Sequence, residues 1–315
     1  MRALNQAPDH SQTAHRVAKS RTGGRVVARA FPEPAASWTA SNAPRRFRML
    51  GVRIDNLTMT DAIGRIIDAA LGRVPRSFAF VNADCLNIAC ENPTYANLLG
   101  QQHDVFADGS GVALAARLRG IAVRENVNGT DMFPLLCEEA AKQGLSIFLL
   151  GGRPGVADGA ARNMADEYPD LSIAGAHHGY FDATQEQEII AMINRSGADI
   201  LLVGLGAPRQ ESWIAANRDK LNAKVTMGVG GLYDYYSGRV WRAPIAMRRT
   251  GMEWVWRMAQ EPQRLWRRYV LGNPKFLARC IGEQVMMMFG HGEALANLHH
   301  LELSGIDVTG PGAAS

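Results

Sequence analysis

An aspartate that follows an apolar run is the residue best placed to do chemistry in this sequence. Asp108 comes directly after DVFA (104–107) and before Gly-Ser-Gly and a segment rich in Ala and Leu. A carboxylate at the end of a strand, facing a crevice, can accept a proton from a hydroxyl group if partial burial raises its pKa. The same position also suits a turn or helix-capping aspartate, so the residues alone leave both roles open.

A second candidate is the run of arginines and tryptophans near the C-terminus. Residues 253–274 contain three tryptophans and four arginines. Arg264, Arg267 and Arg268 have the spacing of one helix face, and Pro262 predicts two helices joined at Glu261. A guanidinium group binds phosphate oxygens in two places and stays charged, which predicts a phosphate-bearing partner.

The wider segment 239–279 has ten Arg or Lys residues against two Glu, and four of the six tryptophans. This composition fits a helical surface on anionic lipid, with Arg268, Arg248, Arg249 and Arg279 as lipid contacts. It equally fits a packed helical hairpin with buried tryptophans and solvated arginines. A nucleic-acid surface is a third interpretation, which we do not favour because the chain lacks the aromatic and basic motifs of RNA-binding sheets.

Glycines gather after three further apolar runs, in LLGGRPGV, VGLGAPRQE and GVGGLYDYYSG. Gly151, Gly152, Gly206 and Gly230 would let backbone N–H groups approach a ligand closely, and such groups favour phosphate at a helix start. GGRPGV only loosely matches the dinucleotide fingerprint. Gln210 could bind a sugar hydroxyl or cap the helix that follows it.

Metal-binding patterns are absent from the sequence. There is no D-x-D motif, and the adjacent His177 and His178 would point to opposite sides of an extended segment. We therefore expect no metal and no cofactor.

The elements that must position these residues alternate along the chain. Buried strands are predicted at 77–82, 104–107, 146–152, 199–206 and 224–231, and helices at 93–102, 109–120, 130–144, 155–169, 184–197 and 211–221. Thr130 and Asp131 are the expected N-cap of the third helix. Strand–helix alternation predicts an α/β fold, Rossmann-like, with a mostly parallel sheet flanked by helices. Ligands of such sheets bind beyond the carboxyl ends of the strands.

Composition predicts how the chain is divided into segments. It has 315 residues, 47% of them hydrophobic, and a formal net charge of +4, which agrees with an anionic partner. Residues 1–46 are predicted to be a disordered basic extension, 47–238 the α/β core, 239–289 a helical appendage and 290–315 a flexible tail. We expect no membrane-spanning segment, no secretory signal and four buried, reduced cysteines.

Seven sequence blocks, in order, resemble one enzyme family. They are FVNADCLN, ADGSGVALAARLRG, NGTDMF, IFLLGG, LLVGLGAPRQESWIAANRD, GVGGLYDYYSGRVWRAP and GMEWVWRMAQEPQRLWRRYVLGNPKFL. Together they cover about Leu50 to Leu277 and resemble the WecG/TagA/CpsF glycosyltransferases, family 26.

The resemblance implies an inverting, metal-independent transferase with a Rossmann-like core and a C-terminal appendage that closes the site. The donor would be a UDP-sugar carrying a hexose or N-acetylhexosamine. The acceptor would be an undecaprenyl-diphosphate-linked saccharide in cell-surface polysaccharide or exopolysaccharide synthesis. The enzyme would be cytoplasmic and peripheral on the anionic inner face of the cell membrane. Self-association stays open.

The resemblance also assigns residues. Asp108 would be the catalytic base, Asn82 and Gln210 would line the sugar pocket, and Asp234 would contact the nucleotide. The appendage arginines of the site would be Arg257, Arg264 and Arg267. Two positions differ from the usual family pattern: Phe80 replaces a Thr, and Asn126 replaces an Arg.

Two rival functions stay open at this point. A nicotinamide-dependent sugar-nucleotide dehydrogenase would need a conventional G-x-G-x-x-G, an acidic residue about twenty positions later and a reactive Cys or Lys, and none of these stands out. A non-catalytic, membrane-associated scaffold that binds a nucleotide sugar would be consistent with Phe80 and Asn126.

Overall fold

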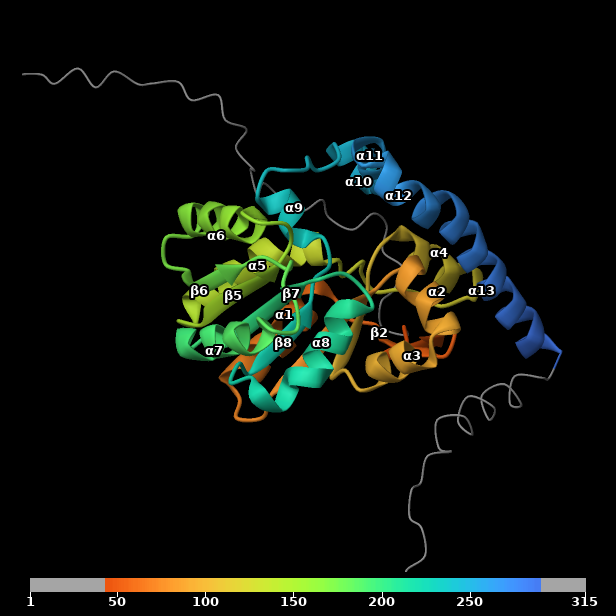
Figure 1. The fold of residues 1–315 in the computed structure, drawn as a ribbon. Coiled ribbons are helices and arrows are strands. Elements are labelled where there is room, and N and C mark those ends of the chain that lie inside the picture. The colour runs from red at the N-terminus through yellow and green to blue at the C-terminus, as the bar shows by residue number, and fades with distance from the viewer. Residues whose placement is uncertain (1–42, 290–315) are drawn as a thin grey trace, which may run out of the picture. The chain divides into compact units, whose positions relative to one another are not determined.

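The computed structural model of the protein describes residues 43–289 (Figure 1). Residues 1–42 and 290–315, which include most of the predicted N-terminal extension and the whole predicted tail, lie outside the described residues.

An eight-stranded sheet forms the centre of the core, with the order β1-β2-β4-β3-β8-β7-β5-β6. β1 pairs with β2 in antiparallel fashion, and all other neighbours are parallel. The strands are β1 (Arg46–Met49), β2 (Val52–Asp55), β3 (Arg76–Val81), β4 (Asp104–Ala107), β5 (Ser146–Gly151), β6 (Ser172–His177), β7 (Ile200–Gly204) and β8 (Val225–Gly228). The predicted α/β class and mostly parallel sheet are confirmed.

Helices cover both faces of this sheet (Figure 1). The core helices are α1 (Met59–Leu71), α2 (Ala83–Glu91), α3 (Pro93–Gly100), α4 (Ser110–Leu118), α5 (Gly129–Lys142), α6 (Val156–Glu167), α7 (Glu186–Ser196), α8 (Arg209–Asn217) and α9 (Leu232–Tyr236), with a short 3₁₀ turn η2 at Arg218–Lys220. In β3, Phe78 and Phe80 pack with α1 and α5, whereas Ala79 and Val81 pack with α2, α3 and α4. Burial on both faces explains why the strands read as continuous apolar runs.

The C-terminal helices follow a loop after α9. They are α10 (Ile245–Arg249), α11 (Glu253–Gln260), α12 (Pro262–Trp266), the π-helical turn η3 (Arg267–Leu271) and α13 (Gly272–Met288). The predicted break at Glu261 and Pro262 is confirmed. Buried Phe276 and Cys280 of α13 pack in the same apolar cluster as α2, so the appendage is attached to the core along that helix.

Several sequence predictions were incomplete or wrong. β1, β2, β6, α1 and α2 were not predicted. The N-cap of α5 is Asn128, and not Thr130 with Asp131 as predicted. The Asn128 side-chain oxygen accepts the Asp131 N–H at 2.8 Å, and the Asn128 side-chain amide donates to the Asp131 carboxylate at 2.7 Å. All four cysteines are free, but Cys90 is exposed rather than buried.

Within residues 43–289, none of the helices combines the length and the apolar character needed to cross a bilayer.

Candidate active site

Asp108 and Asn82 meet where two neighbouring strands end. Asp108 follows β4, and its backbone N–H donates to Val81 O of β3 at 2.9 Å. Asn82 caps α2: its side-chain oxygen accepts from the N–H groups of Asp84 and Cys85, both at 3.1 Å. The Asn82 side chain also hydrogen-bonds to the Asp108 carboxylate. The structure therefore brings these two predicted site residues together.

The Asp108 carboxyl has the proton affinity of a group that could work near neutral pH. Burial raises its pKa from 3.8 to about 6, because a buried carboxylate loses hydration. The positive charge of Arg268 and the hydrogen bond from Asn82 act in the opposite direction. A carboxyl with this pKa is mostly ionised at pH 7 and is a stronger base than an exposed aspartate.

Two contacts fix the turn that follows Asp108. Gly109 has φ 90°, a conformation that favours glycine, and its N–H donates to Asn126 Oδ1 at 2.8 Å. The Ser110 hydroxyl donates to Gly251 O at 2.9 Å. Asn126 thus stabilises the loop of the candidate base, and Gly251 joins that loop to the appendage.

Phe80, the other departure from the family pattern, is buried beside Asn82. Its ring lies 5.5 Å from the Phe106 ring and also contacts Gly129. It fills the core below the site and presents no polar group to it.

The glycine loops of β5 and β7 lie against each other at the carboxyl end of the sheet. A Cβ atom on Gly151 would stand 2.4 Å from Gly204 O, and both Gly151 (φ 137°) and Gly152 (φ 70°) have backbone conformations that favour glycine. α6 and α8, which follow β5 and β7, cover opposite faces of the sheet. Crevices for ligands form at such a switch in topology.

Gln210 joins two of these loops from inside the protein. Its side-chain oxygen accepts the Gly206 N–H at 3.2 Å and the Gly230 N–H at 2.9 Å, and its amide nitrogen donates to Glu211 at 2.8 Å. Gln210 is 4% exposed and Glu211 1%. Gln210 therefore acts on the site through the backbone of the loops at the ends of β7 and β8. Glu211 belongs to the same GAPRQE motif, but the sequence predicted a role only for Gln210.

A charged cluster surrounds Asp234 on α9. Asp234 accepts from Arg239 at 2.8 Å, from Arg257 at 2.9 Å and from Arg264 at 3.3 Å. Glu261 pairs with the same three arginines, at 3.1 Å, 2.7 Å and 3.1 Å respectively. Three guanidinium groups against two carboxylates leave one positive charge in excess. Arg239 and Glu261 were not predicted as site residues, although both lie in the motifs quoted above.

This arginine cluster borders the loop after β8. A Cβ atom on Gly231 would lie 3.5 Å from Arg264 Nη2 and 3.7 Å from Arg257 Nη2. The Arg257 guanidinium also lies over the Tyr235 ring at 4.7 Å, and its Nη1 is buried without a hydrogen-bond partner. Burial opposes the charged form of Asp234, but hydrogen bonds and charge from Arg239 and Arg257 lower its pKa. The cluster therefore stays ionised.

The three arginines expected on one face do not share a partner. Arg264 binds Asp234 and Glu261, whereas Arg267 is exposed, with its guanidinium 5.4 Å from the centre of the Trp266 ring. Arg268 points to the core and pairs with Asp84 at 3.4 Å. The expectation of a common face was wrong because the helix widens to a π turn at η3.

Not all of the arginines expected at a lipid surface are free to reach one. Arg279 donates to Asn87 O and Oδ1 at 3.0 Å and to Glu91 at 2.7 Å, so its guanidinium serves the contact between α13 and α2. Arg248 and Arg249 of α10 are exposed, although Arg248 comes within 3.8 Å of Asp131.

Two comparisons show which known proteins this chain is similar to. A model of the Glycosyl transferase WecG/TagA/CpsF family matches residues 47–288, a range that includes Asp108, the glycine loops and the arginine cluster. The chain is also 33% identical over 219 residues to a Bacillus subtilis (strain 168) protein, N-acetylglucosaminyldiphosphoundecaprenol N-acetyl-beta-D-mannosaminyltransferase. That alignment covers 69% of this chain and 82% of the relative.

Proposed function

The chain belongs to the WecG/TagA/CpsF family of glycosyltransferases, and on that premise we propose that it moves a hexose or N-acetylhexosamine from a UDP-sugar to an undecaprenyl-diphosphate-linked saccharide. The observation that carries this proposal is Asp108: a carboxyl that directly follows an interior strand of the sheet, with a pKa of about 6 and a hydrogen bond from Asn82. The printed name of the Bacillus subtilis relative supports the lipid-linked acceptor.

The proposed reaction is a single displacement with inversion at the sugar. The acceptor hydroxyl oxygen bonds to C1 of the donor sugar while the bond from C1 to the phosphate oxygen breaks. The hydroxyl proton passes to Asp108, and UDP leaves with both electrons of the broken bond. A base with a pKa close to the working pH suits this step, because it is ionised before the reaction and strong enough to take the proton.

The departing UDP gains negative charge, which the protein must stabilise. The excess positive charge of the cluster formed by Arg239, Arg257 and Arg264, and its place beside Gly231 and the β8 loop, suit this task. Arg267 is exposed, and its guanidinium lies over the Trp266 ring, so its side chain would have to rotate to bind the diphosphate. We propose that Asp234 holds these arginines in position and contacts the nucleotide when the donor binds.

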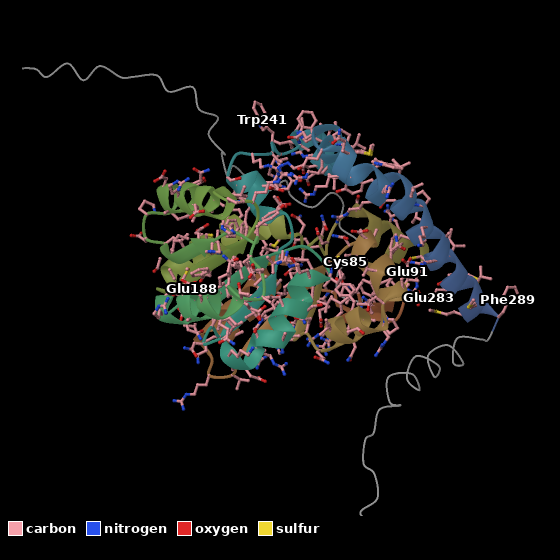
Figure 2. All side chains as sticks on the ribbon, in the orientation of Figure 1. Cys85, Glu91, Glu188, Trp241, Glu283 and Phe289 are labelled. Atoms are coloured by element: carbon pink, nitrogen blue, oxygen red, sulfur yellow. The ribbon has the colours of Figure 1, made fainter. Side chains whose placement is uncertain are left out.

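The C-terminal helices supply a surface that suits a lipid-linked substrate. The backbone of Trp241 is held by Gln260, at 2.8 Å to its N–H and 2.9 Å to its carbonyl oxygen, and by the Trp256 indole at 3.0 Å. Its ring is 75% exposed (Figure 2). An anchored backbone with an exposed indole is well suited to the headgroup region of a membrane. We propose peripheral contact with an anionic inner membrane surface through this region.

The decisive experiment is a screen of UDP-sugars against a short-chain lipid-diphosphate saccharide, with release of UDP measured with and without acceptor. Acceptor-dependent release, with the new bond of opposite anomeric configuration to the donor, supports the proposal. Activity should survive EDTA, since arginines replace a metal. Reduction of NAD by a UDP-sugar would identify a dehydrogenase instead, and UDP-sugar binding without turnover would identify a scaffold.

A further inference from the structure

The π turn η3 separates two arginines that are adjacent in the chain. A π turn holds more residues than an α turn and changes the direction of the side chains within it. Arg267 extends over the outer Trp266 ring, whereas Arg268 turns toward the start of α2. Such turns are frequent at functional sites, and this one aims one cation of the appendage at the core.

Arg268 lies among groups of the candidate active site. Its Nε is 3.4 Å from Asp84 Oδ2, and its guanidinium lies 5.6 Å from the centre of the Tyr269 ring. Its charge also acts on the Asp108 carboxylate. Asp84 is connected to the same carboxylate by a second route, because Asn82 accepts the Asp84 N–H at 3.1 Å and hydrogen-bonds to Asp108.

Other charged groups around Asp108 oppose its ionisation. Glu253 of α11 and Asp131 of α5 place like charge near it. Arg242 pairs with both, at 3.5 Å to Glu253 and 2.8 Å to Asp131, which weakens but does not remove their effect. The phenol of Tyr269 on η3 also interacts with Asp108. Burial and these carboxylates all favour the protonated form, so an ionised base needs a cation that faces it.

We propose that Arg268 is a positioning residue for the candidate base: held in place by Asp84, and acting with Asn82, it keeps the Asp108 carboxylate charged and ready to accept a proton. The assignment of Asp108 as base rests on the proposed function, but the charge relation between Arg268 and Asp108 does not. The inference also changes the expected role of Arg268, which becomes a residue of the site and not a lipid contact.

The sign of the expected pKa change follows from the charges of the two residues. Removal of the Arg268 charge removes a stabilising partner of the Asp108 carboxylate and raises its pKa. Removal of the Asp84 charge acts in the opposite direction, because Arg268 is released from its partner and one negative charge near Asp108 disappears. A purely structural role for Arg268 would not produce opposite shifts from these two substitutions.

The test is the titration of Asp108 in the unliganded protein, followed by ¹³C NMR of labelled aspartate carboxyl groups and assigned by the signal lost in Asp108→Asn. We expect the titration to move to higher pH in Arg268→Met, to move less in Arg268→Lys, and to move to lower pH in Asp84→Asn. Lys275→Met is the matched control: Lys275 is an appendage cation paired with Glu91 at 2.5 Å, and the Asp108 titration should stay in place.

The pH profile of kcat/KM on a soluble acceptor gives the functional readout. In Arg268→Met the acid limb should move to higher pH, with a loss on the order of tenfold near pH 6 that recovers in alkaline buffer. An unchanged Asp108 titration in Arg268→Met, or an equal shift in Lys275→Met, would overturn the proposal. If the wild-type protein transfers no sugar, the proposed function fails, while the NMR titration still decides the role of Arg268.

Discussion

Two aspartates of the site have opposite proton affinities, and their surroundings explain why. Asp108 is partly buried beside one cation and two carboxylates, and the loss of hydration dominates and raises its pKa to about 6. Asp234 is also buried, but hydrogen bonds from Arg239 and Arg257 lower its pKa. Opposite pKa shifts of these two carboxyl groups agree with the different tasks proposed for them: proton transfer for Asp108 and charge pairing for Asp234.

Substitution of Asp108 by Asn should lower activity without lowering stability. The change preserves size and a hydrogen-bond acceptor for Asn82 but removes the base, so we expect kcat to fall by about 10²- to 10⁴-fold. Turnover at the wild-type rate, measured by UDP release with the correct donor, would remove Asp108 from the role of base.

The same variant should be more stable than the wild type at neutral pH. The folded-state pKa of about 6 lies above the ordinary value of 3.8, so the ionised carboxylate costs stability, and this cost grows between about pH 4 and pH 6. We expect Asp108→Asn to raise Tm by a few degrees above about pH 7, with the difference disappearing toward about pH 4. A lower Tm at pH 7 would contradict the burial cost.

At the scale of the elements, the loops after β7 and β8 depend on one buried pair. Gln210 accepts from the N–H groups of Gly206 and Gly230, and its amide nitrogen donates to Glu211. Gly228 leaves room for this amide, since a Cβ there would stand 2.7 Å from Gln210 Nε2. A buried donor without an acceptor costs about 1–3 kcal/mol.

Glu211 can therefore be tested with two substitutions of similar size. Glu211→Gln retains an acceptor for Gln210 and should keep near wild-type KM for the donor. Glu211→Met leaves the amide without a partner, and we expect the donor KM to rise about tenfold and the urea midpoint to fall. Equal effects of both substitutions would show that the negative charge of Glu211 matters more than its acceptor.

The elements that the sequence predicted well are those with strong local signals. β3, β4, β5, β7 and β8 are buried on both faces and read as apolar runs. β6 was missed because its residues are small and only half buried. β1 (RFRM) and β2 (VRID) were missed because charged residues interrupt their apolar runs. Asp108 and Asn82 could be placed because each comes directly after a strand.

Side-chain direction was harder to predict than strand position. The spacing of Arg264, Arg267 and Arg268 assumes a regular α-helix, and nothing in the sequence identifies the π turn that separates them. Glu261 pairs with Arg239, 22 residues away in the chain. Asp234 pairs with Arg257 and Arg264, 23 and 30 residues away. Periodicity cannot reveal contacts at this separation. The assigned catalytic and binding roles stay predictions.

For the whole molecule, the appendage links the arginine cluster to the core. Figure 2 marks Glu91 and Glu283 where α13 lies along the core. Glu283 accepts from Arg119 at 2.9 Å and from the Leu50 N–H at 3.1 Å. This mostly buried pair of Arg119 and Glu283 holds α13 against the core. The appendage therefore contacts the core through α13 as well as through the arginine cluster around Asp234.

Removal of residues 239–315 should therefore abolish turnover on a soluble acceptor and leave a folded core. All eight strands of the described sheet end by Gly228, so the circular dichroism spectrum of the truncated protein should keep its α/β character. Asp234 loses its arginine partners, and the apolar contact of Phe276 with the core disappears, so we expect a lower Tm. Full activity of the truncated core would mean that the appendage only anchors the protein.

Membrane contact should depend on the exposed groups of the appendage. Trp241→Ala and Arg249→Gln should each weaken binding to anionic vesicles, and salt should reduce the effect of Arg249→Gln. Arg279→Gln should have little effect on binding, because this guanidinium is held by Asn87 and Glu91. Vesicle sedimentation at low and high salt measures all three, and an effect of Arg279→Gln equal to that of Arg249→Gln would contradict this division.

The place of β8 in the sheet has a consequence for how the protein is made. β8 is the last strand within residues 43–289, yet it lies between β3 and β7 and joins the two halves of the sheet. Until the ribosome has released residues 225–228, the facing edges of β3 and β7 have no partner, and unpaired edges of this kind promote aggregation. Chains that stop before β8 should accumulate as insoluble material or bind chaperones, whereas chains that extend just past it close the sheet in a single late step.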